Sequence, residues 1–365
     1  MAEWMKTSLI DIVKLIGGGT PKTTKSEYWG GNINWLSVKD FNNENRYVYS
    51  TEKTITEEGL NNSSTKLLQK NDIIISARGT VGELAMIPYP MAFNQSCYGI
   101  RAVKGVDSTF LYYLIKNSVK KIKLITHGSV FDTITRETFA NIDVEIPDIK
   151  TQQSIANVLS NIDDKIEINQ RINNNLEQQV QTIFDDMFPD IFSLNANATL
   201  QDLIVFTNGK KRPETIGNIP VYGGNGVLAY TDESNANNCV IIGRVGAYCG
   251  NTFLCLDKCW TSDNAIQAKS RNESSPLFIY YLLRNASLFS RHIGTGQPLM
   301  TQGILNAIPI KYPLEEKVST FIDICTPAHK MIFSNIQQNK FLVSTRESLL
   351  PKLISGELDV SDLDI

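Results

Sequence analysis

Two arginines occupy matching places in this chain, and their chemistry suits a phosphate or the edge of a purine. Arg78 follows the apolar run that begins at Ile73, and Arg244 follows the run that begins at Val240. A glycine-rich turn lies beside each arginine. An extended guanidinium at the end of a buried strand can bind guanine through two hydrogen bonds or hold a phosphate. The alternative is a structural arginine that binds loop carbonyls or a carboxylate.

Further polar side chains near glycine turns extend this interpretation to other segments. The basic run 210–212 follows Gly209, and its partner in the first half is the segment 20–22. We expect it to contact phosphates, the alternative being a solvated loop. The small residues of 126–129 match those of 294–297 and would let the backbone approach a phosphate. The complete set of candidate nucleic-acid contacts is Thr20, Lys22, Ser37, Arg78, Thr80, Ser129, Lys210, Lys211, Arg212, Tyr222, Asn225, Arg244 and Gln297.

The sequence gives little support for catalysis or metal binding. It contains no double-proline loop of the adenine methyltransferase kind, no phosphate-binding loop and no nucleophile elbow. Cys239, Cys249, Cys255 and Cys259 are separated by nine, five and three residues, with no C-x-x-C pair. We therefore expect buried apolar cysteines and no metal site.

The elements that position these residues occur twice, in the same order. The run from Leu9 to a glycine turn is repeated from Leu200, and the two arginine segments follow. Each copy then has two adjacent tyrosines, which begin at Tyr112 in the first copy and at Tyr280 in the second. Each copy ends in an apolar strand with a proline. This order predicts a duplicated α/β module.

A helical segment follows each module. Apolar residues recur in steps of four and three between 152 and 187 and again between 318 and 353, with Asn169 and Asn173 in the middle of the first segment. This rhythm is typical of a coiled coil with a polar middle. Chain order requires the two helices to pair antiparallel if they lie side by side. We expect these helices to bind partner proteins. The positions assigned to the partner-binding helices are Ile155, Leu159, Ile162, Ile166, Leu176, Val180, Ile322, Ile332, Ile336 and Val343.

The predicted fold class is mixed α/β, with two pseudo-repeated modules separated by two long antiparallel coiled-coil helices. The predicted boundaries are residues 1–147 and 199–313 for the modules and 148–198 and 314–365 for the helical spacers. The net charge of the 365-residue chain is −3, but the modules carry +2 and +3 and the spacers −5 and −3. A module that binds DNA needs basic surface only where phosphates approach. No apolar run could span a membrane and no secretory leader precedes Asp11, so a cytoplasmic location is expected.

The chain resembles the specificity subunits of type I restriction-modification systems, and its two modules resemble the target-recognition domains of that family. The resemblance extends over essentially the whole chain, including the helical segments around Gln152 and Leu349. In the first module the residues that carry the resemblance are Gly18–Lys22, Tyr28–Gly31, Ile33–Asp40, Asn71–Gly82 and Ala92–Cys97. In the second module Ile219–Gly226 resembles another variant of the target-recognition domain.

The resemblance implies a non-catalytic subunit that reads a bipartite target in double-stranded DNA, one module for each half-site. It also implies two methyltransferase subunits and ATP-driven restriction subunits as partners. S-adenosylmethionine, ATP and magnesium would then be bound by the partners and not by this chain. The alternative function is a scaffold that does not bind DNA and gathers two copies of a partner on its pseudo-two-fold helices.

Overall fold

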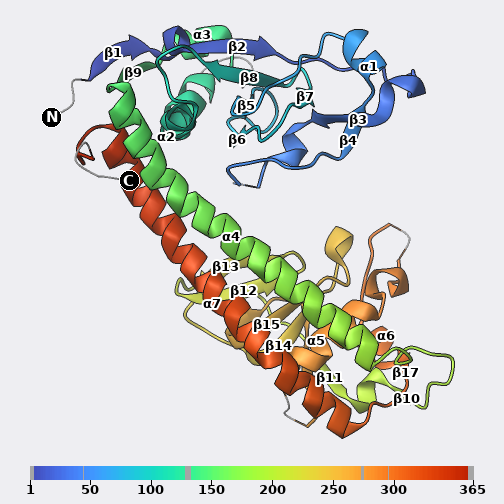
Figure 1. Cartoon of the computed structure of the whole chain (residues 1–365). Coiled ribbons are helices and arrows are strands. Elements are labelled where there is room, and N and C mark those ends of the chain that lie inside the picture. Colours follow the sequence, from blue (N-terminus) through green and yellow to red (C-terminus); the bar gives the residue numbers. More distant parts are fainter. Residues whose placement is uncertain (1–3, 44, 128–132, 273–274, 295, 361–365) are drawn as a thin grey trace. The chain divides into compact units, whose positions relative to one another are not determined.

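The computed structural model describes residues 4–43, 45–127, 133–272, 275–294 and 296–360, and Figure 1 shows its elements in chain order. The chain divides into two compact units. Unit 1 contains residues 1–170 and 336–365, and unit 2 contains residues 171–335. Among the described residues, no helix is both long and apolar enough to cross a membrane.

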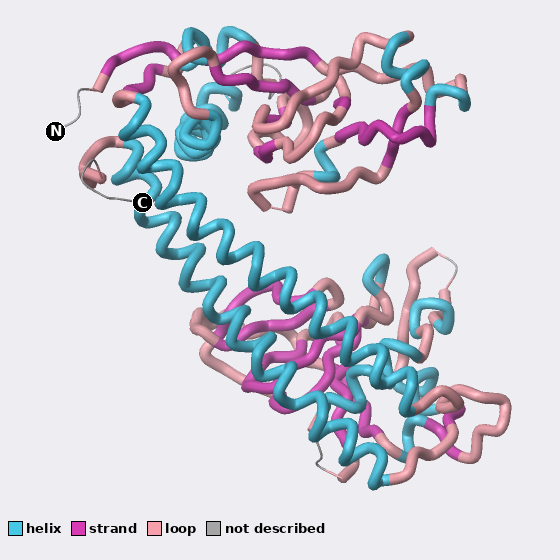
Figure 2. The backbone as a smooth tube through the Cα atoms, in the orientation of Figure 1, coloured by secondary structure: helices cyan, strands magenta, loops and turns pink. Residues whose placement is uncertain are grey.

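The module of unit 1 is built from short strands and three helices (Figure 2). β1 (Met5–Ser8) pairs antiparallel with β9 (Asp143–Ile146). A four-stranded sheet has the order β2 (Val13–Gly17), β8 (Cys97–Ala102), β5 (Ile73–Ser76) and β6 (Leu84–Met86), and a three-stranded sheet has the order β4 (Lys53–Ile55), β3 (Trp29–Leu36) and β7 (Ala92–Phe93). The helices are α1 (Glu57–Asn61), α2 (Ser108–His127) and α3 (Arg136–Ala140), with 3-10 turns η1 (Leu9–Ile12), η2 (Ser26–Tyr28) and η3 (Val38–Asp40).

The module of unit 2 contains one larger sheet. β10 (Ala198–Thr199) pairs antiparallel with β17 (Pro309–Ile310). The six-stranded sheet has the order β11 (Ile204–Asn208), β16 (Ala265–Ser270), β14 (Ala236–Gly243), β15 (Thr252–Thr261), β12 (Ile219–Gly223) and β13 (Gly226–Thr231). The helices are α5 (Pro276–Asn285) and α6 (Gln302–Asn306), with 3-10 turns η4 (Leu200–Asp202), η5 (Gly246–Tyr248) and η6 (Leu288–Arg291).

The two modules share the order of elements that the sequence predicts. A short strand and a 3-10 turn open each module, and the closing strand pairs back with the opening one. The amide of Leu9 donates to the carbonyl of Ile142 at 2.9 Å, and the amide of Leu200 donates to that of Ile308 at the same distance. The buried runs beginning at Ile73 and Val240 form the strands β5 and β14 in the interiors of their sheets. The internal repeat of the sequence is therefore also a repeat in the structure.

Two long helices follow the modules. α4 (Ile149–Met187) and α7 (Glu315–Ile354) each contribute residues to both units. α4 begins three residues before the predicted Gln152, because the Asp148 carboxylate accepts hydrogen bonds from the amides of Lys150 and Thr151. Such a side-chain acceptor satisfies the free amides of a first helical turn.

Within each unit the two helices lie side by side and run in opposite directions (Figure 1). In unit 1 the side-chain Nδ2 of Asn169 donates to Gln338 Oε1 at 2.7 Å and to Asn339 Oδ1 at 2.8 Å. In unit 2 the side-chain Nδ2 of Asn335 donates to Asn173 Oδ1 at 2.8 Å. The predicted polar middle of the first helix is confirmed, and its amides bind amides of the second helix.

The predicted apolar face is correct along most of both helices and wrong at Ile336, which is 43% exposed. The face passes through Asn335 and Asn339, whose side chains have polar partners on α4. Ile336 is displaced by about 100° from Asn335 around the helix. Buried positions are Ile155, Leu159, Val180 and Ile332, and half-buried positions are Ile162, Ile166, Leu176, Ile322 and Val343.

A buried polar contact joins each module to the helix that follows it. In unit 1 the hydroxyl of Tyr113 donates to Asp163 of α4 at 2.6 Å, and Arg346 of α7 donates to the same carboxylate at 2.5 Å. In unit 2 the hydroxyl of Tyr281 lies 3.0 Å from His329 Nε2. Asp163 and His329 are both the fifteenth residue of their helix. The two modules thus use the same helical position with different chemistry.

We expect Arg346→Met to destabilise unit 1 by about 3–5 kcal/mol, because it leaves the Asp163 carboxylate buried without a cation. The two side chains are each only 6% exposed. Urea unfolding measures the change. Substitution of the exposed Lys6 by alanine removes the Lys6–Glu145 pair and serves as the control, with an expected cost below about 1 kcal/mol. Equal effects of the two substitutions would contradict the buried contact.

Acidification should weaken unit 2 through His329. Burial, and then the charge of Arg284, lower the pKa of His329 to about 4. The unfolded chain binds this proton below about pH 6.5 and the folded chain only near pH 4, so stability falls as the pH falls through that window. We expect a loss of about 2 kcal/mol between pH 7 and pH 5. His329→Gln keeps an acceptor for Tyr281 and should remove this loss; an unchanged pH dependence would contradict the assignment.

Candidate nucleic-acid interface

Three distant segments of the first module converge on Phe93 and on the loop Asn94–Ser96 that follows it and connects β7 to β8. The amide of Asn94 donates to the carbonyl of Leu36 at 3.0 Å, at the end of β3. The amide of Gly19 donates to Phe93 at 2.9 Å, and the amide of Arg78 donates to Ser96 at 3.2 Å. We call Asn94–Ser96 the central loop of the first module.

The second module has the same arrangement around Thr261 and the loop Ser262–Asn264 that follows it, which is its central loop. The amide of Ser262 donates to the carbonyl of Tyr222 at 2.9 Å, at the end of β12. The backbone amide of Lys210 donates to the carbonyl of Thr261 at 3.0 Å, and the backbone amide of Arg244 donates to the carbonyl of Asn264 at 2.9 Å. Each central loop follows a strand that pairs in parallel, β7 with β3 and β15 with β12. Backbone hydrogen bonds therefore bring the predicted arginine, strand-end and glycine-turn segments together twice.

A close backbone approach explains the glycine turns at these points. A Cβ atom on Gly18 would lie 2.0 Å from the carbonyl oxygen of Asn94. One on Gly209 would lie 1.9 Å from the carbonyl oxygen of Ser262. Since real contacts of Cβ atoms are never this short, only glycine lets the first segment reach the central loop.

The two arginines that the sequence singles out differ in their surroundings. Arg78 is exposed, and no side-chain partner binds its guanidinium among the described residues. Arg244 is half-buried, its Nη1 donates to the carbonyl of Asp263 at 3.4 Å, and its Nε is buried without a partner in the described part of the chain. Arg244 thus has the structural contact of the alternative interpretation, yet part of its hydrogen-bonding capacity is unused.

A fourth segment joins the central loop of the second module through Arg244. The amide of Met300 donates to the Arg244 carbonyl at 2.8 Å, and the amide of Gly246 donates to Pro298 at 2.9 Å. Gln297, exposed, precedes this contact. In the first module the amide of Ile134 donates to the Ala77 carbonyl at 3.0 Å, while the predicted Ser129 lies outside the described residues.

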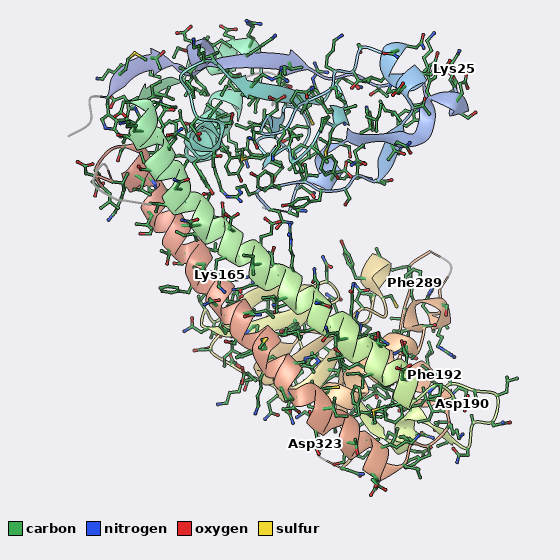
Figure 3. The ribbon with its side chains drawn as sticks, viewed as in Figure 1. Lys25, Lys165, Asp190, Phe192, Phe289 and Asp323 are labelled. Carbon is green, nitrogen blue, oxygen red and sulfur yellow. The ribbon has the colours of Figure 1, made fainter. Side chains whose placement is uncertain are left out.

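The remaining candidates occupy surface or structural positions. Lys22, Thr80, Lys210, Lys211, Arg212 and Asn225 are exposed. Ser37 is half-buried, and its amide and hydroxyl donate to Asp40 at 2.7 and 2.9 Å, so it caps η3. Tyr222 is half-buried with its ring 6.2 Å from that of Phe253, centroid to centroid. Lys25, on the same segment as Lys22, projects from the surface of the module (Figure 3).

Sequence reasoning missed two residues at equivalent points of the central loops. Gln95 and Asp263 are both exposed, and each lies two residues after the end of the parallel strand pairing, which is Phe93 in one module and Thr261 in the other. The Thr20 hydroxyl donates to Gln95 Oε1. The parallel registers that align Gln95 with Asp263 involve strands distant in sequence, so no local signal revealed the equivalence.

The cysteines lie in the interior. All six are buried, and burial raises the pKa of the Cys97 thiol to about 12, with the charge of Asp40 contributing. Among the described residues, no three or more His, Cys, Asp or Glu side chains are grouped so that they could hold a metal ion.

Comparison with known proteins assigns the chain to a family. The sequence model described as the type I restriction modification DNA specificity domain matches residues 1–178 and 195–326. The chain is 27% identical to the type I restriction enzyme MjaIX specificity subunit of Methanocaldococcus jannaschii, with 99% of this chain and 95% of that protein covered. It is 23% identical to the type I restriction enzyme EcoprrI specificity subunit of Escherichia coli, with 86% of this chain and 84% of that protein covered.

A solved structure agrees in fold. The S subunit of a type I restriction-modification system from M. genitalium matches with a TM-score of 0.59 and 18% identity, covering 97% of this chain and 96% of that one. The two family matches correspond to the two repeated modules with adjoining parts of the helices. The chain therefore belongs to the family of type I restriction-modification DNA specificity subunits.

Proposed function

We propose that this chain is the DNA-specificity subunit of a type I restriction-modification complex and reads a bipartite target, one half-site with each module. The observation that carries the proposal is the duplicated convergence of distant segments on a central loop. In each module the convergence brings an arginine to the central loop, and in the second module it also brings the exposed basic run 210–212. Phosphate contacts position a protein on DNA, and loops held by a rigid scaffold can read base edges.

The helices supply the partner surface in this proposal. α4 and α7 form an antiparallel coiled coil that docks two methyltransferase subunits. Restriction subunits join the same complex, in the cytoplasm where the DNA is accessible. The chain contributes specificity, while the partners bind S-adenosylmethionine, ATP and magnesium and carry out methylation and cleavage.

Exchange of one module tests independent reading. We expect replacement of residues 1–147 by the corresponding module of a relative to change one half of the methylated sequence and leave the other half intact. Backbone contacts of each central loop lie within its own module, which is the physical reason for independence. Methylome sequencing of cells that contain the variant and its methyltransferase subunit is the measurement. A change in both halves would contradict the proposal.

The basic run makes a separate prediction about phosphate binding. Alanine at Lys210, Lys211 and Arg212 should weaken binding to all duplexes alike and reduce the slope of log affinity against log salt by up to about 0.9 for each phosphate that is no longer bound. Binding to a duplex at several salt concentrations measures the slope. A matched control replaces the exposed Lys317, Lys330 and Lys340 of α7, which removes the same charge. Equal slopes for the two triple variants would place the run away from DNA.

A further inference from the structure

Gln95 and Asp263 occupy the same position in the two copies of the central loop. Leu36 pairs with Phe93 and Tyr222 pairs with Thr261, so both registers place the residue two further along at the middle of the loop. Both side chains are exposed, whereas the backbone around them is held by hydrogen bonds to the three converging segments. This combination of a fixed backbone and an exposed polar tip is what direct reading of a base edge requires.

Gln95 carries a side-chain amide in a fixed orientation. The Thr20 hydroxyl donates to Gln95 Oε1, and that oxygen has a second lone pair. Nε2 then lies on the opposite side of the amide as a donor. Adenine presents an N6 donor beside an N7 acceptor in the major groove, and a glutamine amide matches both.

Asp263 has the opposite chemistry at the same point. Its carboxylate only accepts hydrogen bonds. The Arg244 backbone amide donates to Asn264 of the same loop, the Arg244 guanidinium donates to the Asp263 carbonyl, and the Lys210 backbone amide donates to Thr261 just before the loop. A carboxylate repels phosphates, so at a DNA surface it needs a base that offers a donor. Cytosine offers its N4 amino group, whereas adenine places the N7 acceptor beside its donor, where it would oppose a carboxylate.

We propose that Gln95 and Asp263 are specificity-determining residues, Gln95 reading an adenine in one half-site and Asp263 a cytosine in the other. Thr20 is a positioning residue for Gln95. The inference rests on the proposed function, and it adds one base of each half-site and the residue that selects it.

An exchange of the two functional groups tests the assignment. Gln95→Glu removes the donor from one loop, and Asp263→Asn adds a donor to the other, with little change in size. The full-length chain and each variant are used to select duplexes from a pool with a random central segment, and the enriched duplexes are sequenced. We expect adenine to become cytosine at one position for Gln95→Glu and cytosine to become adenine at one position for Asp263→Asn. The preference at each position should shift by about 5- to 150-fold.

Matched controls make the same chemical changes outside the central loops. Gln69→Glu and Asp232→Asn alter exposed residues of the first and second module, and they should leave every enriched base unchanged. Thr20→Val should weaken the adenine preference without replacing it, because the amide is retained but no longer held.

The outcomes separate this inference from the function on which it rests. If the unaltered chain enriches no sequence, the proposed function fails. If the unaltered chain enriches a bipartite sequence and Gln95→Glu and Asp263→Asn leave its bases as they were, or lose enrichment at all positions together, the assignment of Gln95 and Asp263 is wrong.

Discussion

The backbone hydrogen bond between the end of one strand and the start of each central loop is the constraint on which both modules depend. It joins Asn94 to Leu36 and Ser262 to Tyr222, across 58 and 40 residues of chain. The glycine-turn and arginine segments of each module then donate their backbone amides to carbonyls of the central loop or of the residue before it. Buried backbone groups without partners are costly, so the loop conformation is set by the backbone more than by its side chains.

This separation of backbone from side chain suits a recognition module. Hydrogen bonds between main-chain atoms are indifferent to the identity of Gln95 or Asp263 and leave both side chains exposed. Substitution of an exposed residue away from such contacts usually changes stability by less than about 0.5 kcal/mol. The modules can therefore differ at their readout positions while keeping one fold.

Much of the fold could be predicted from the sequence because its signals are local or repeated. The buried runs at Ile73 and Val240, the paired tyrosines and the four-three rhythm of the helices each appear within a short window. The failure at Ile336 has a specific cause. A hydrophobic pattern favours isoleucine over Asn335, yet the structure places Asn335 at the interface because Asn173 offers it a hydrogen bond. Periodicity of apolar residues does not register such polar pairs.

The candidate site was predictable in its segments, whereas the equivalence of its two central loops was not predictable. Arg78, Arg244 and the basic run stand out as charges beside glycine turns, whereas Gln95 is an ordinary polar residue until its register with β3 is known. The same limit applies to the joints between modules and helices. Tyr113 and Tyr281 repeat visibly, but their partners Asp163 and His329 differ in type and share only a helical position. At these positions equivalence is a property of the backbone, so it is recognised when strands and helices are superposed and not when residue types are compared.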